Sequence, residues 1–592
     1  MKVNLRRLLA RIAVIEREKI KDKKEWFRLI SGVCPINRAG KECVYEKDGQ
    51  VGINEELCMG CGICVKKDPW QAIQIINLPE ELETEPIHRY GANQFCLYSL
   101  PVPIFGKVVG IVGVNGIGKS TAIQILAGVL EPNLGQIGKK TDYKKLIDFF
   151  RGTEAQVFFE KIRDKQITIS YKPQHVDLIP KKFKGKVKDL LTKVDEGKKL
   201  GEVVKQLDIE NIMDNDIGKI SGGELQRVAI AAAVLKKANL YIFDEPSSYL
   251  DIKQRLKIAK FIKELANEET SIVVIEHDLI VMDYMADLIH IMYGRQGAYG
   301  VVSQLKAAKA GINSYLEGFI QEDNIRFRDH KIMFETKPPV KKGKEFMLTE
   351  WEAMSKKLGK FKLDITPGEV SRHETIGIIG ENGIGKTSFV KILAGVENAD
   401  KGEMPSAITV SYKPQTLEAD SPEIVINVLN DAIKHHTNDI INPLNIPELF
   451  TKSLNQLSGG ELQRVSIALA LSKKCSLCLL DEPSAYLDVE QRLLVSKVIR
   501  NFCEHSGISI MVVDHDLLFI DYLADRLIVF EGEPAIHGVE KGPFSMEEGM
   551  NRLLSDVEIT LRRDEESGRP RINKPGSVKD REQKSKGMYY YS

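Results

Sequence analysis

The sequence lacks any run of about 18 to 20 uncharged apolar residues, the length that a membrane-spanning helix needs. It also lacks an N-terminal apolar segment followed by a small-residue cleavage site, so no secretory signal is predicted. Charge of one sign is not in excess, since 84 Lys and Arg nearly cancel 83 Asp and Glu to a net charge of +1. We therefore expect a cytoplasmic protein without a membrane partner, in which any nucleic-acid binding depends on local basic patches.

Cysteine is scarce and unevenly placed, with six of the nine cysteines in the first hundred residues. In an intracellular chain this crowding favours metal chemistry over disulfides. The length of 592 residues, 43% of them hydrophobic, predicts three or four domains. Two local basic patches stand out, residues 1–30 and 562–586. The arginine-rich first ten residues are also typical of a mitochondrial presequence, but we interpret them as a short extension.

Two glycine-rich loops each follow a short apolar segment, at residues 108–112 and 376–379. Both have the spacing of a P-loop, whose backbone N–H groups surround phosphates at the start of a helix while its lysine reaches the β- and γ-phosphates. The predicted nucleotide-binding residues are Gly113, Asn115, Gly116, Gly118, Lys119, Ser120 and Thr121 in the first loop, and Gly380, Asn382, Gly383, Gly385, Lys386, Thr387 and Ser388 in the second.

Each loop is followed by the same four motifs in the same order. These are a glutamine after Tyr-Lys-Pro, a Ser-Gly-Gly-Glu segment, an apolar run ending in Asp-Glu-Pro, and an apolar run ending before His-Asp. They supply Gln174, Ser221, Gly222, Gly223, Asp244, Glu245 and His277 in the first half, and Gln415, Ser458, Gly459, Gly460, Asp481, Glu482 and His515 in the second. Phosphoryl transfer needs positioning and charge neutralisation, and two carboxylates after a strand suit the metal and the attacking water.

This ordered set resembles the ATP-binding cassette (ABC) ATPases. The resemblance implies that Glu245 and Glu482 polarise the attacking water and that His277 and His515 contact the γ-phosphate. It implies that Asp244 and Asp481 hold Mg²⁺ through water, with direct Mg²⁺ ligands from Ser120, Gln174, Thr387 and Gln415. It also implies composite sites, in which Ser221 closes over the Lys386 site and Ser458 over the Lys119 site.

The first half carries an insertion. The lysine of the P-loop and the glutamine are 55 residues apart in the first half and 29 in the second, a difference of about 26 residues. The extra residues, about 139–165, predict two short amphipathic helices around a loop. They are either a packing decoration or a basic, partly aromatic contact for a large partner.

Near the N-terminus lies half of a ferredoxin signature. Cys58-x2-Cys61-x2-Cys64 is followed by Asp68-Pro69 where Cys-Pro is expected. In two-cluster ferredoxins the fourth cysteine of each run ligates the other cluster, so Cys34 of Cys34-Pro35 completes this set. The four cysteines Cys34, Cys58, Cys61 and Cys64 thus predict one [4Fe–4S] cluster.

The other cluster is predicted to be absent, because residues 12–33 contain no cysteine and include Ile20, Glu25 and Trp26. Zn²⁺ on the same four cysteines, or an empty remnant, remains an alternative. Cys43 and Cys96 are interpreted as small buried residues.

A ferredoxin-type run ahead of twin cassettes resembles the ABC-E family of ribosome-recycling ATPases, also called RNase L inhibitors. The segments that carry this resemblance are Cys34-Pro-Ile-Asn-Arg-Ala-Gly, His88-Arg-Tyr-Gly-Ala-Asn-Gln-Phe and Arg569-Pro-Arg-Ile-Asn-Lys, and it extends from about Arg11 onwards. It implies a multidomain α/β fold with a ferredoxin-like Fe–S domain and two head-to-tail nucleotide-binding cassettes. The expected bounds are 1–82 for the Fe–S domain, 83–294 and 341–545 for the cassettes, 295–340 for a first hinge, and 546–592 for a second hinge with a basic tail.

The family also implies further contacts. Tyr90 and Phe361, the aromatics before each P-loop, are expected to stack on adenine, unless they are ordinary core residues. Ribosomal RNA is expected to meet the basic tail, unless that tail is merely solvated. The tail residues are Arg562, Arg563, Arg569, Arg571 and Lys574.

The function implied by the resemblance is ATP-driven splitting of post-termination ribosomes. The partners would be the small subunit with its rRNA and proteins, a class-one release factor or its surveillance paralogue, and initiation factors, with the protein itself a monomer off the ribosome. The cluster would act as a rigid cross-link, because the cysteine segments carry few apolar residues. The alternatives are an ABC-F-like translation factor, a transporter ATPase subunit, and a non-catalytic ribosome-bound scaffold.

Overall fold

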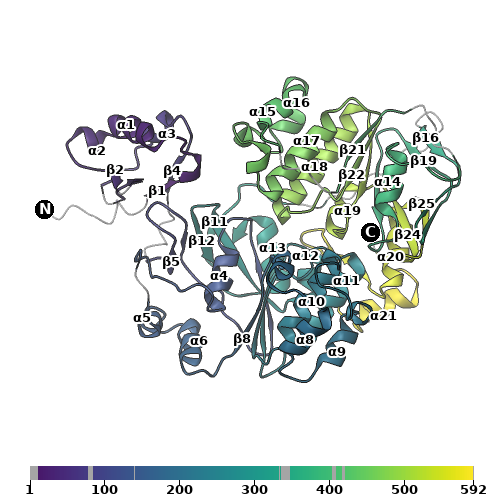
Figure 1. Ribbon diagram of the computed structural model, residues 1–592, viewed down its shortest axis with the longest axis horizontal. Coiled ribbons are helices and arrows are strands. Elements are labelled where there is room, and N and C mark those ends of the chain that lie inside the picture. Colours follow the sequence, from purple (N-terminus) through teal and green to yellow (C-terminus); the bar gives the residue numbers. More distant parts are fainter. Residues whose placement is uncertain are drawn as a thin grey trace.

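The computed structural model describes residues 11–47, 49–55, 57–77, 85–138, 141–332, 334, 347–402, 408–415 and 421–590. The predicted extension in the first ten residues lies outside this range. A small N-terminal domain lies at one end of the molecule, beside the first of two large α/β units, which we call cassettes 1 and 2 (Figure 1). No described helix combines the length and the apolar character needed to cross a membrane.

The N-terminal domain contains two small antiparallel sheets and three helices. Strand β1 (Arg11–Ile15) pairs with β4 (Ile73–Asn77), and β2 (Val44–Lys47) pairs with β3 (Gln50–Ile53). The helices are α1 (Lys23–Val33), α2 (Pro35–Arg38) and α3 (Ile63–Lys67). Trp26 and Ile30 on α1 are fully buried in an apolar core. The domain therefore has more apolar packing than its cysteine segments suggest, because α1 packs on β2 and β3 with its apolar side chains in the shared core.

Cassette 1 is built on one mixed sheet in the order β5-β6-β12-β11-β7-β10-β9-β8, with β13 beside β11. The strands are β5 (His88–Arg89), β6 (Cys96–Leu97), β7 (Val108–Val112), β8 (Ile169–Lys172), β9 (Leu240–Asp244), β10 (Ser271–Ile275), β11 (Leu288–Arg295), β12 (Tyr299–Val302) and β13 (Lys306–Ala307). Its helices are α4 (Lys119–Leu126), α7 (Ile179–Lys182), α8 (Val187–Val194), α9 (Leu200–Gln206), α10 (Gly222–Val234), α11 (Ile252–Glu264) and α12 (Leu279–Met285). Strands β7, β9 and β10 are buried throughout, as expected of a parallel sheet covered on both faces.

Cassette 2 repeats this plan in the strand order β17-β18-β25-β24-β20-β23-β22-β21. The strands are β17 (Met354–Leu358), β18 (Phe361–Ile365), β20 (Thr375–Ile379), β21 (Val410–Lys413), β22 (Leu477–Asp481), β23 (Ser509–Val513), β24 (Arg526–Glu533) and β25 (His537–Ser545), with β16 (Met347–Trp351) paired to β19 (Gly368–Ser371). The helices are α14 (Lys386–Leu393), α15 (Val425–Val428), α16 (Asn430–His435), α17 (Gly459–Ser472), α18 (Val489–Ser506), α19 (Leu517–Leu523) and α20 (Met546–Asp556).

The insertion in cassette 1 consists of α5 (Tyr143–Phe149) and α6 (Glu154–Arg163). Its aromatic rings face inward: Phe150 stacks on Phe159 with ring centroids 5.4 Å apart, and Phe158 is also buried. These phenylalanine rings form the core of the insertion, whereas Tyr143 at the start of α5 is 46% exposed, so the partner contact stays a prediction. Lys144 and Lys145 are exposed.

Two connecting regions differ from their expected bounds. Strand β11 runs to Arg295 and pairs with β12, so the first sheet continues past residue 294 into the expected first hinge. Helix α20 packs on β24 and β25, so cassette 2 continues past residue 545. These segments belong to the cassettes because they pair with or pack on the cassette sheets, and such contacts cannot be read from residue type alone.

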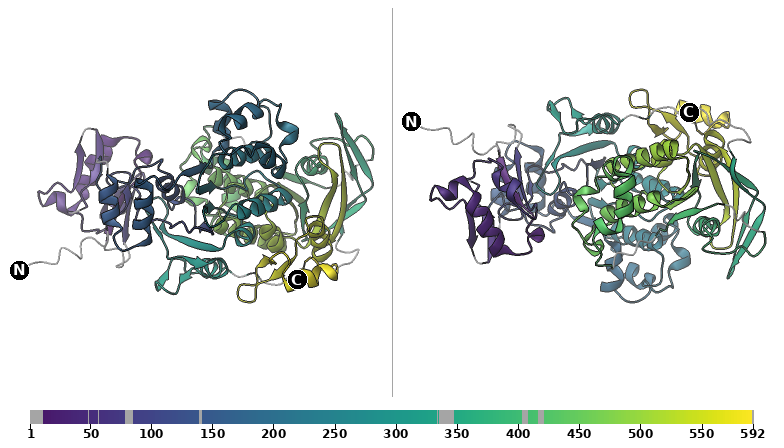
Figure 2. Two further views of the ribbon diagram at one scale, coloured as in Figure 1. Left: turned by 90° about the horizontal axis from the view of Figure 1, so that it is seen from below. Right: turned by 90° about the horizontal axis from the view of Figure 1, so that it is seen from above.

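The remaining elements lie around the junction of the two cassettes (Figure 2). They are α13 (Ala308–Glu317), the hairpin β14 (Phe319–Ile320) and β15 (Ile325–Arg326), the hairpin β26 (Leu561–Arg563) and β27 (Pro570–Ile572), and α21 (Val578–Ser585). We call the β26–β27 pair, residues 561–572, the arginine hairpin.

Candidate functional site: two facing nucleotide sites and a thiol-lined cavity

Each P-loop joins a buried strand to a helix. Gly116 and Gly118 have φ values of 70° and 91°, and Gly383 and Gly385 of 73° and 101°, conformations that favour glycine. Lys119 Nζ donates to the carbonyls of Gly113 and Val114 at 2.8 Å. Burial lowers the pKa of both P-loop lysines, to about 8 for Lys386. Each ammonium group thus donates to backbone carbonyls of its own loop. A bound anionic phosphate would raise the lysine pKa back toward its usual value.

The carboxylates predicted for metal and water follow the central strands. Asp244 ends β9 and Asp481 ends β22. Burial raises the pKa of Asp244 to about 6 and also raises that of Asp481, while the neighbouring Ser120 and Thr387 act in the opposite direction. In both cassettes the hydroxyl predicted to bind Mg²⁺ therefore lies near enough to lower the pKa of the aspartate predicted to hold that ion.

The following glutamates, Glu245 and Glu482, both have φ of 48°, a strained value for a side chain with a Cβ. Gln174 Nε2 donates to Glu245 Oε1 at 2.6 Å, and Gln415 Nε2 to Glu482 Oε1 at 2.7 Å. The His277 and His515 Nε2 atoms lie 3.4 and 3.6 Å from the same oxygens. The structure thus brings the glutamine, glutamate and histidine of each predicted set together.

Two further residue types, which the motifs did not single out, hold these strand ends in place. Lys172 Nζ donates to Asp244 O at 2.8 Å, and Lys413 Nζ to Asp481 O at 2.8 Å. Gln226 Nε2 donates to Glu245 O at 2.6 Å, and its counterpart Gln463 does the same to Glu482 O. The repeated Tyr-Lys-Pro-Gln and Gly-Glu-Leu-Gln-Arg segments were the sequence signal for them.

One substitution makes the two sites chemically different. Ser248 Oγ donates to Glu245 Oε2 at 3.1 Å, whereas the matching residue in cassette 2 is Ala485. Burial acts to raise the pKa of Glu245, but contacts with His277, Lys119 and Ser248 outweigh it and lower the pKa to about 2. Burial raises the pKa of Glu482, which has no such hydroxyl.

The cassettes face each other through reciprocal contacts. Asn115 N, in the first P-loop, donates to Asp488 Oδ2 of cassette 2 at 2.9 Å. Asn382 N, in the second P-loop, donates to Asp251 Oδ2 of cassette 1 at 3.0 Å. Each P-loop is therefore bound by the opposite cassette, which is the head-to-tail arrangement.

A cavity of about 2380 Å³ lies between the cassettes. The signature residues Ser221 and Ser458, each the N-cap of its helix, both line it. So do residues of both P-loops, both glutamates and both histidines. Side chains of the N-terminal domain, Glu16 and Lys66 among them, line the same cavity. Residues from all three units thus meet around one space.

The aromatic residues need one correction. A Cβ on Gly118 would lie 2.5 Å from Phe95, and one on Gly385 would lie 3.1 Å from Phe361, so Phe95 is the counterpart of Phe361. Tyr90 is half exposed and its hydroxyl lies 3.1 Å from Thr121 Oγ1. The matching of Tyr90 with Phe361 was wrong, because Tyr90 lies one turn before the strand position that Phe95 and Phe361 share. The adenine contact of Tyr90 stays a prediction.

The N-terminal domain is attached to the segment that carries Tyr90. Asn93, 1% exposed, accepts from Ile53 N at 2.9 Å and donates to Ala13 O at 2.9 Å. Arg17 donates to Ala92 O at 3.0 Å. The segment next to the first P-loop is thus held directly by the N-terminal domain.

The predicted ligand cysteines gather around a small cavity in that domain. Cys34, Cys58, Cys61 and Cys64 all line it, and its other lining residues include Ile36, Val44, Ile53 and Ile75. Cys43 lines it as well. Four thiols in an apolar enclosure match the donor set of a [4Fe–4S] cluster, so the residues present fit that group. Cys43 is buried, as expected, and it is also a fifth thiol on the cavity wall.

Asp68, at the position of the expected fourth cysteine, has a structural role. It is 5% exposed and accepts from Trp70 N, Ala72 N and Ile73 N at 3.1, 2.7 and 3.0 Å. Ile20 and Trp26, from the segment without cysteines, are buried in the apolar core. Backbone hydrogen bonds thus account for Asp68 and apolar packing for Ile20 and Trp26, whereas Glu25 is exposed, and the absence of a second cluster stays a prediction.

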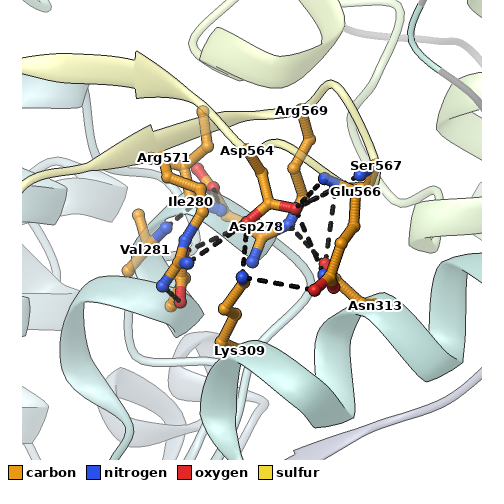
Figure 3. A network of polar contacts seen from close by, with 11 residues as sticks. Asp278, Ile280, Val281, Lys309, Asn313, Asp564, Glu566, Ser567, Arg569 and Arg571 are labelled. Carbon is orange, nitrogen blue, oxygen red and sulfur yellow. Dashed lines mark hydrogen bonds and ion pairs between the residues drawn. The ribbon is translucent and has the colours of Figure 1, made fainter.

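The basic tail differs from the expectation for an RNA contact. Arg569 is fully buried, and its Nη1 lies 3.0 Å from Asp283 Oδ2. Arg571 pairs with the same carboxylate at 2.6 and 3.0 Å. It also pairs with Asp564 at 3.2 Å, within the hairpin (Figure 3). Arg563 pairs with Asp521 at 2.7 and 3.0 Å. Arg569 is thus too buried for the expected rRNA contact. The contact stays a prediction for Arg563 and Arg571, which are paired but partly exposed, for Arg562, which is partly exposed, and for the exposed Lys574.

These features define an ABC-type ATP-binding protein with two cassettes in one chain. The ABC transporter family profile matches residues 105–248 and 363–485. ABC transporter E family member 1 of Arabidopsis thaliana is 44% identical, over 98% of this chain and 99% of its own length. The chain belongs to this ABC-E family.

Two solved structures are also similar. A model of ribosome-bound archaeal Pelota and ABCE1 contains a chain with a TM-score of 0.91 and 50% identity, covering 98% of this chain and 99% of its own. The second is a complex of the archaeal ribosomal stalk protein aP1 with the archaeal ribosome recycling factor aABCE1. Its matching chain has a TM-score of 0.82 and 51% sequence identity, and the match covers 86% of this chain and 99% of that one.

Proposed function

We propose that this protein is an ATP-driven ribosome recycling factor that hydrolyses ATP to ADP and phosphate. The similar chains of known structure are described as a ribosome recycling factor and as ribosome-bound together with Pelota, and both matches span most of this chain. The partners are the small subunit, a class-one release factor or its surveillance paralogue, and initiation factors. The protein acts as a monomer and stays on the small subunit after splitting.

The observation that carries the proposal is the pair of reciprocal contacts at Asn115–Asp488 and Asn382–Asp251, beside two complete hydrolytic residue sets. Nucleotide bound at either P-loop touches both cassettes, so binding draws them together and hydrolysis releases them. In each site Asp244 or Asp481 holds Mg²⁺ through water beside the P-loop hydroxyl. Glu245 or Glu482 orients the attacking water, and the lysine and histidine stabilise the γ-phosphate charge.

Movement of the cassettes reaches the N-terminal domain through Ala92 and Asn93, which follow Tyr90 by two and three residues. Closure at the first site therefore displaces that domain as a rigid body toward the release factor, which separates the subunits. Cys34, Cys58, Cys61 and Cys64 would hold one [4Fe–4S] cluster, which would cross-link the segment of Cys34 to the segment of Cys58, Cys61 and Cys64. Arg562 and Lys574 are among the tail residues that contact rRNA phosphates.

Two assays test this proposal together. We expect ATP turnover by the purified protein, and co-sedimentation with small subunits in the presence of a non-hydrolysable ATP analogue. The rival function, a non-catalytic ABC-F-like or scaffold protein on the ribosome, predicts co-sedimentation without turnover. Absence of both would contradict the proposal and its rival alike.

A further inference from the structure

The thiol-lined cavity holds one more cysteine than a [4Fe–4S] cluster needs. Cys34, Cys43, Cys58, Cys61 and Cys64 line it, and a single cluster takes four thiolates. Exposure differs among the five: Cys43 is 1% exposed and Cys34 9%, while Cys61 is exposed to solvent. The surplus thiol is therefore not an accessible surface group.

Hydrogen bonds place Cys43 next to Cys58. Asn54 O accepts from Cys58 N at 2.9 Å and from Cys43 Sγ at 3.8 Å. Asn54 N in turn donates to Cys43 O at 2.6 Å. One backbone carbonyl thus bridges the thiol of Cys43 and the amide of Cys58, which fixes the two residues side by side.

A second pair of bonds places Cys43 next to Cys34. Asn37, three residues after Cys34, donates from Nδ2 to Val44 O at 2.9 Å and accepts from Val44 N at 2.7 Å. Val44 directly follows Cys43, so the turn that begins at Cys34 and the strand that begins after Cys43 are tied together. Cys43 is therefore held between two of the predicted ligands, with its thiol on the cavity wall.

We propose that Cys43 is a reserve ligand of the cluster, able to bind the iron that would otherwise be bound by Cys58 or Cys34. This inference rests on the proposed cluster and adds to it a fifth functional thiol. When either neighbour is missing, the Cys43 thiol releases its proton to solvent and its sulfur forms the Fe–S bond that the missing residue would have made. No electron is transferred, because one thiolate simply replaces another.

Cys64 provides the matched comparison. It also lines the cavity, but it belongs to α3, whose helical hydrogen bonding fixes its position. Replacement of Cys64 is therefore not compensated, because Cys43 is tied to the segments of Cys58 and Cys34 instead.

The test uses the full chain, purified without oxygen, with iron and sulfide analysis, visible absorption and electron paramagnetic resonance of the reduced protein. We expect Cys43→Ser alone, Cys58→Ser and Cys34→Ser each to keep the wild-type iron content. We expect the double variants Cys43→Ser/Cys58→Ser and Cys43→Ser/Cys34→Ser to lose the cluster, and Cys64→Ser to lose it with Cys43 present. Binding of a fluorescent ATP analogue shows that the cassettes of each variant are folded.

Several results would overturn the inference. Equal iron content in Cys58→Ser and in its double variant, and likewise for the Cys34 pair, would show that Cys43 does not substitute. Loss of iron in Cys43→Ser alone would make Cys43 an ordinary ligand. A wild-type protein without iron would remove the cluster itself and the inference with it, whereas the first two results leave the cluster standing.

Discussion

Asp283 and Asp521 occupy matching positions in the two cassettes, each six residues after the predicted catalytic histidine, and arginines of one hairpin bind both. Asp283 lies in α12 and holds Arg569 and Arg571, whereas Asp521 lies in α19 and holds Arg563. The arginine hairpin is therefore a common support for the helices that follow His277 and His515. Both aspartates are buried, so these pairs are little screened by solvent.

The first prediction concerns this support. Asp283→Asn leaves the buried Arg569 charge without its carboxylate, and breaking a buried pair in this way costs about 3 to 5 kcal/mol. Asp521→Asn is expected to cost less, because its partner Arg563 is 25% exposed. In Asp283→Asn, hydrogen exchange in α12 and β27 should therefore accelerate. In Asp521→Asn, exchange in α19 and β26 should accelerate by a smaller factor. If both variants kept the hydrogen-exchange protection of the wild type, these ion pairs would not be what holds the hairpin to the cassettes.

The second prediction concerns the difference between the two sites. Ala485→Ser should give Glu482 the hydroxyl partner that Ser248 gives Glu245, and thereby lower the pKa of Glu482. A carboxylate with a lower pKa stays ionised to lower pH, so the acid limb of kcat/KM should move down by up to about one pH unit. The measurement is ATP turnover from pH 5 to 8 in a Glu245→Gln background, where Glu482 supplies the water-orienting carboxylate.

Ser248→Ala in a Glu482→Gln background is the reverse control. The pKa of Glu245 should rise, and any acid limb should move up rather than down. Profiles that superimpose on those of the parent variants would exclude the hydroxyl as the source of the difference.

The third prediction concerns a buried carboxyl away from both sites. Glu540 is fully buried and hydrogen-bonded to Thr366 through Oε2 at 3.0 Å, and burial raises its pKa to about 7. The folded state therefore holds this proton more tightly than the unfolded state, whose pKa is near 4.5. Stability from this group is full below about pH 4.5 and falls as pH rises to about 7, by at most about 3 kcal/mol.

Glu540→Gln removes that titration. As the pH rises from 5 to 8.5, the Tm of the wild type should fall relative to the Tm of the variant. This holds whichever of the two proteins is more stable at pH 5. A constant difference across this range would show that Glu540 titrates near its ordinary pKa.

The fourth prediction concerns the attachment of the N-terminal domain. Asn93→Ala leaves Ile53 N–H and Ala13 C=O buried without partners, at a cost of about 1 to 3 kcal/mol for each. Hydrogen exchange at Ile53 should accelerate, and protease cleavage between the domain and cassette 1 should become faster. Gln74→Ala, which removes a 3.0 Å bond to Glu16 within the domain, is the control and should leave that cleavage unchanged.

The sequence predicted the twin cassettes well because each motif combines a residue type with a strict position between strand and helix. Gly118, Lys119 and Glu245 could be placed from the sequence because a P-loop or a strand end admits few alternatives. The resemblance to the ABC-E family supplied the order of the domains, and the high identity to its members supports that order.

What the sequence could not give are contacts between distant segments. The charge of Arg569 is visible in the sequence, but its partner Asp283 lies 286 residues earlier and becomes its neighbour only through folding. The burial of Cys43 was expected, but its place on the cavity wall was not, since spacing does not show which face of a segment meets the cavity. Phe95 was missed because several aromatics precede the first P-loop, and only the contact with the loop glycine shows which of them matches Phe361.

The most direct test of the central claim is a light-scattering assay of post-termination ribosomes supplied with release factor, ATP and this protein. We predict repeated splitting by the wild type over many turnovers. The Glu245→Gln/Glu482→Gln variant should split at most about one ribosome per molecule, because it closes on ATP without resetting. Undiminished splitting by that variant in multiple turnover, or none by the wild type, would contradict ATP-driven recycling by the two facing sites.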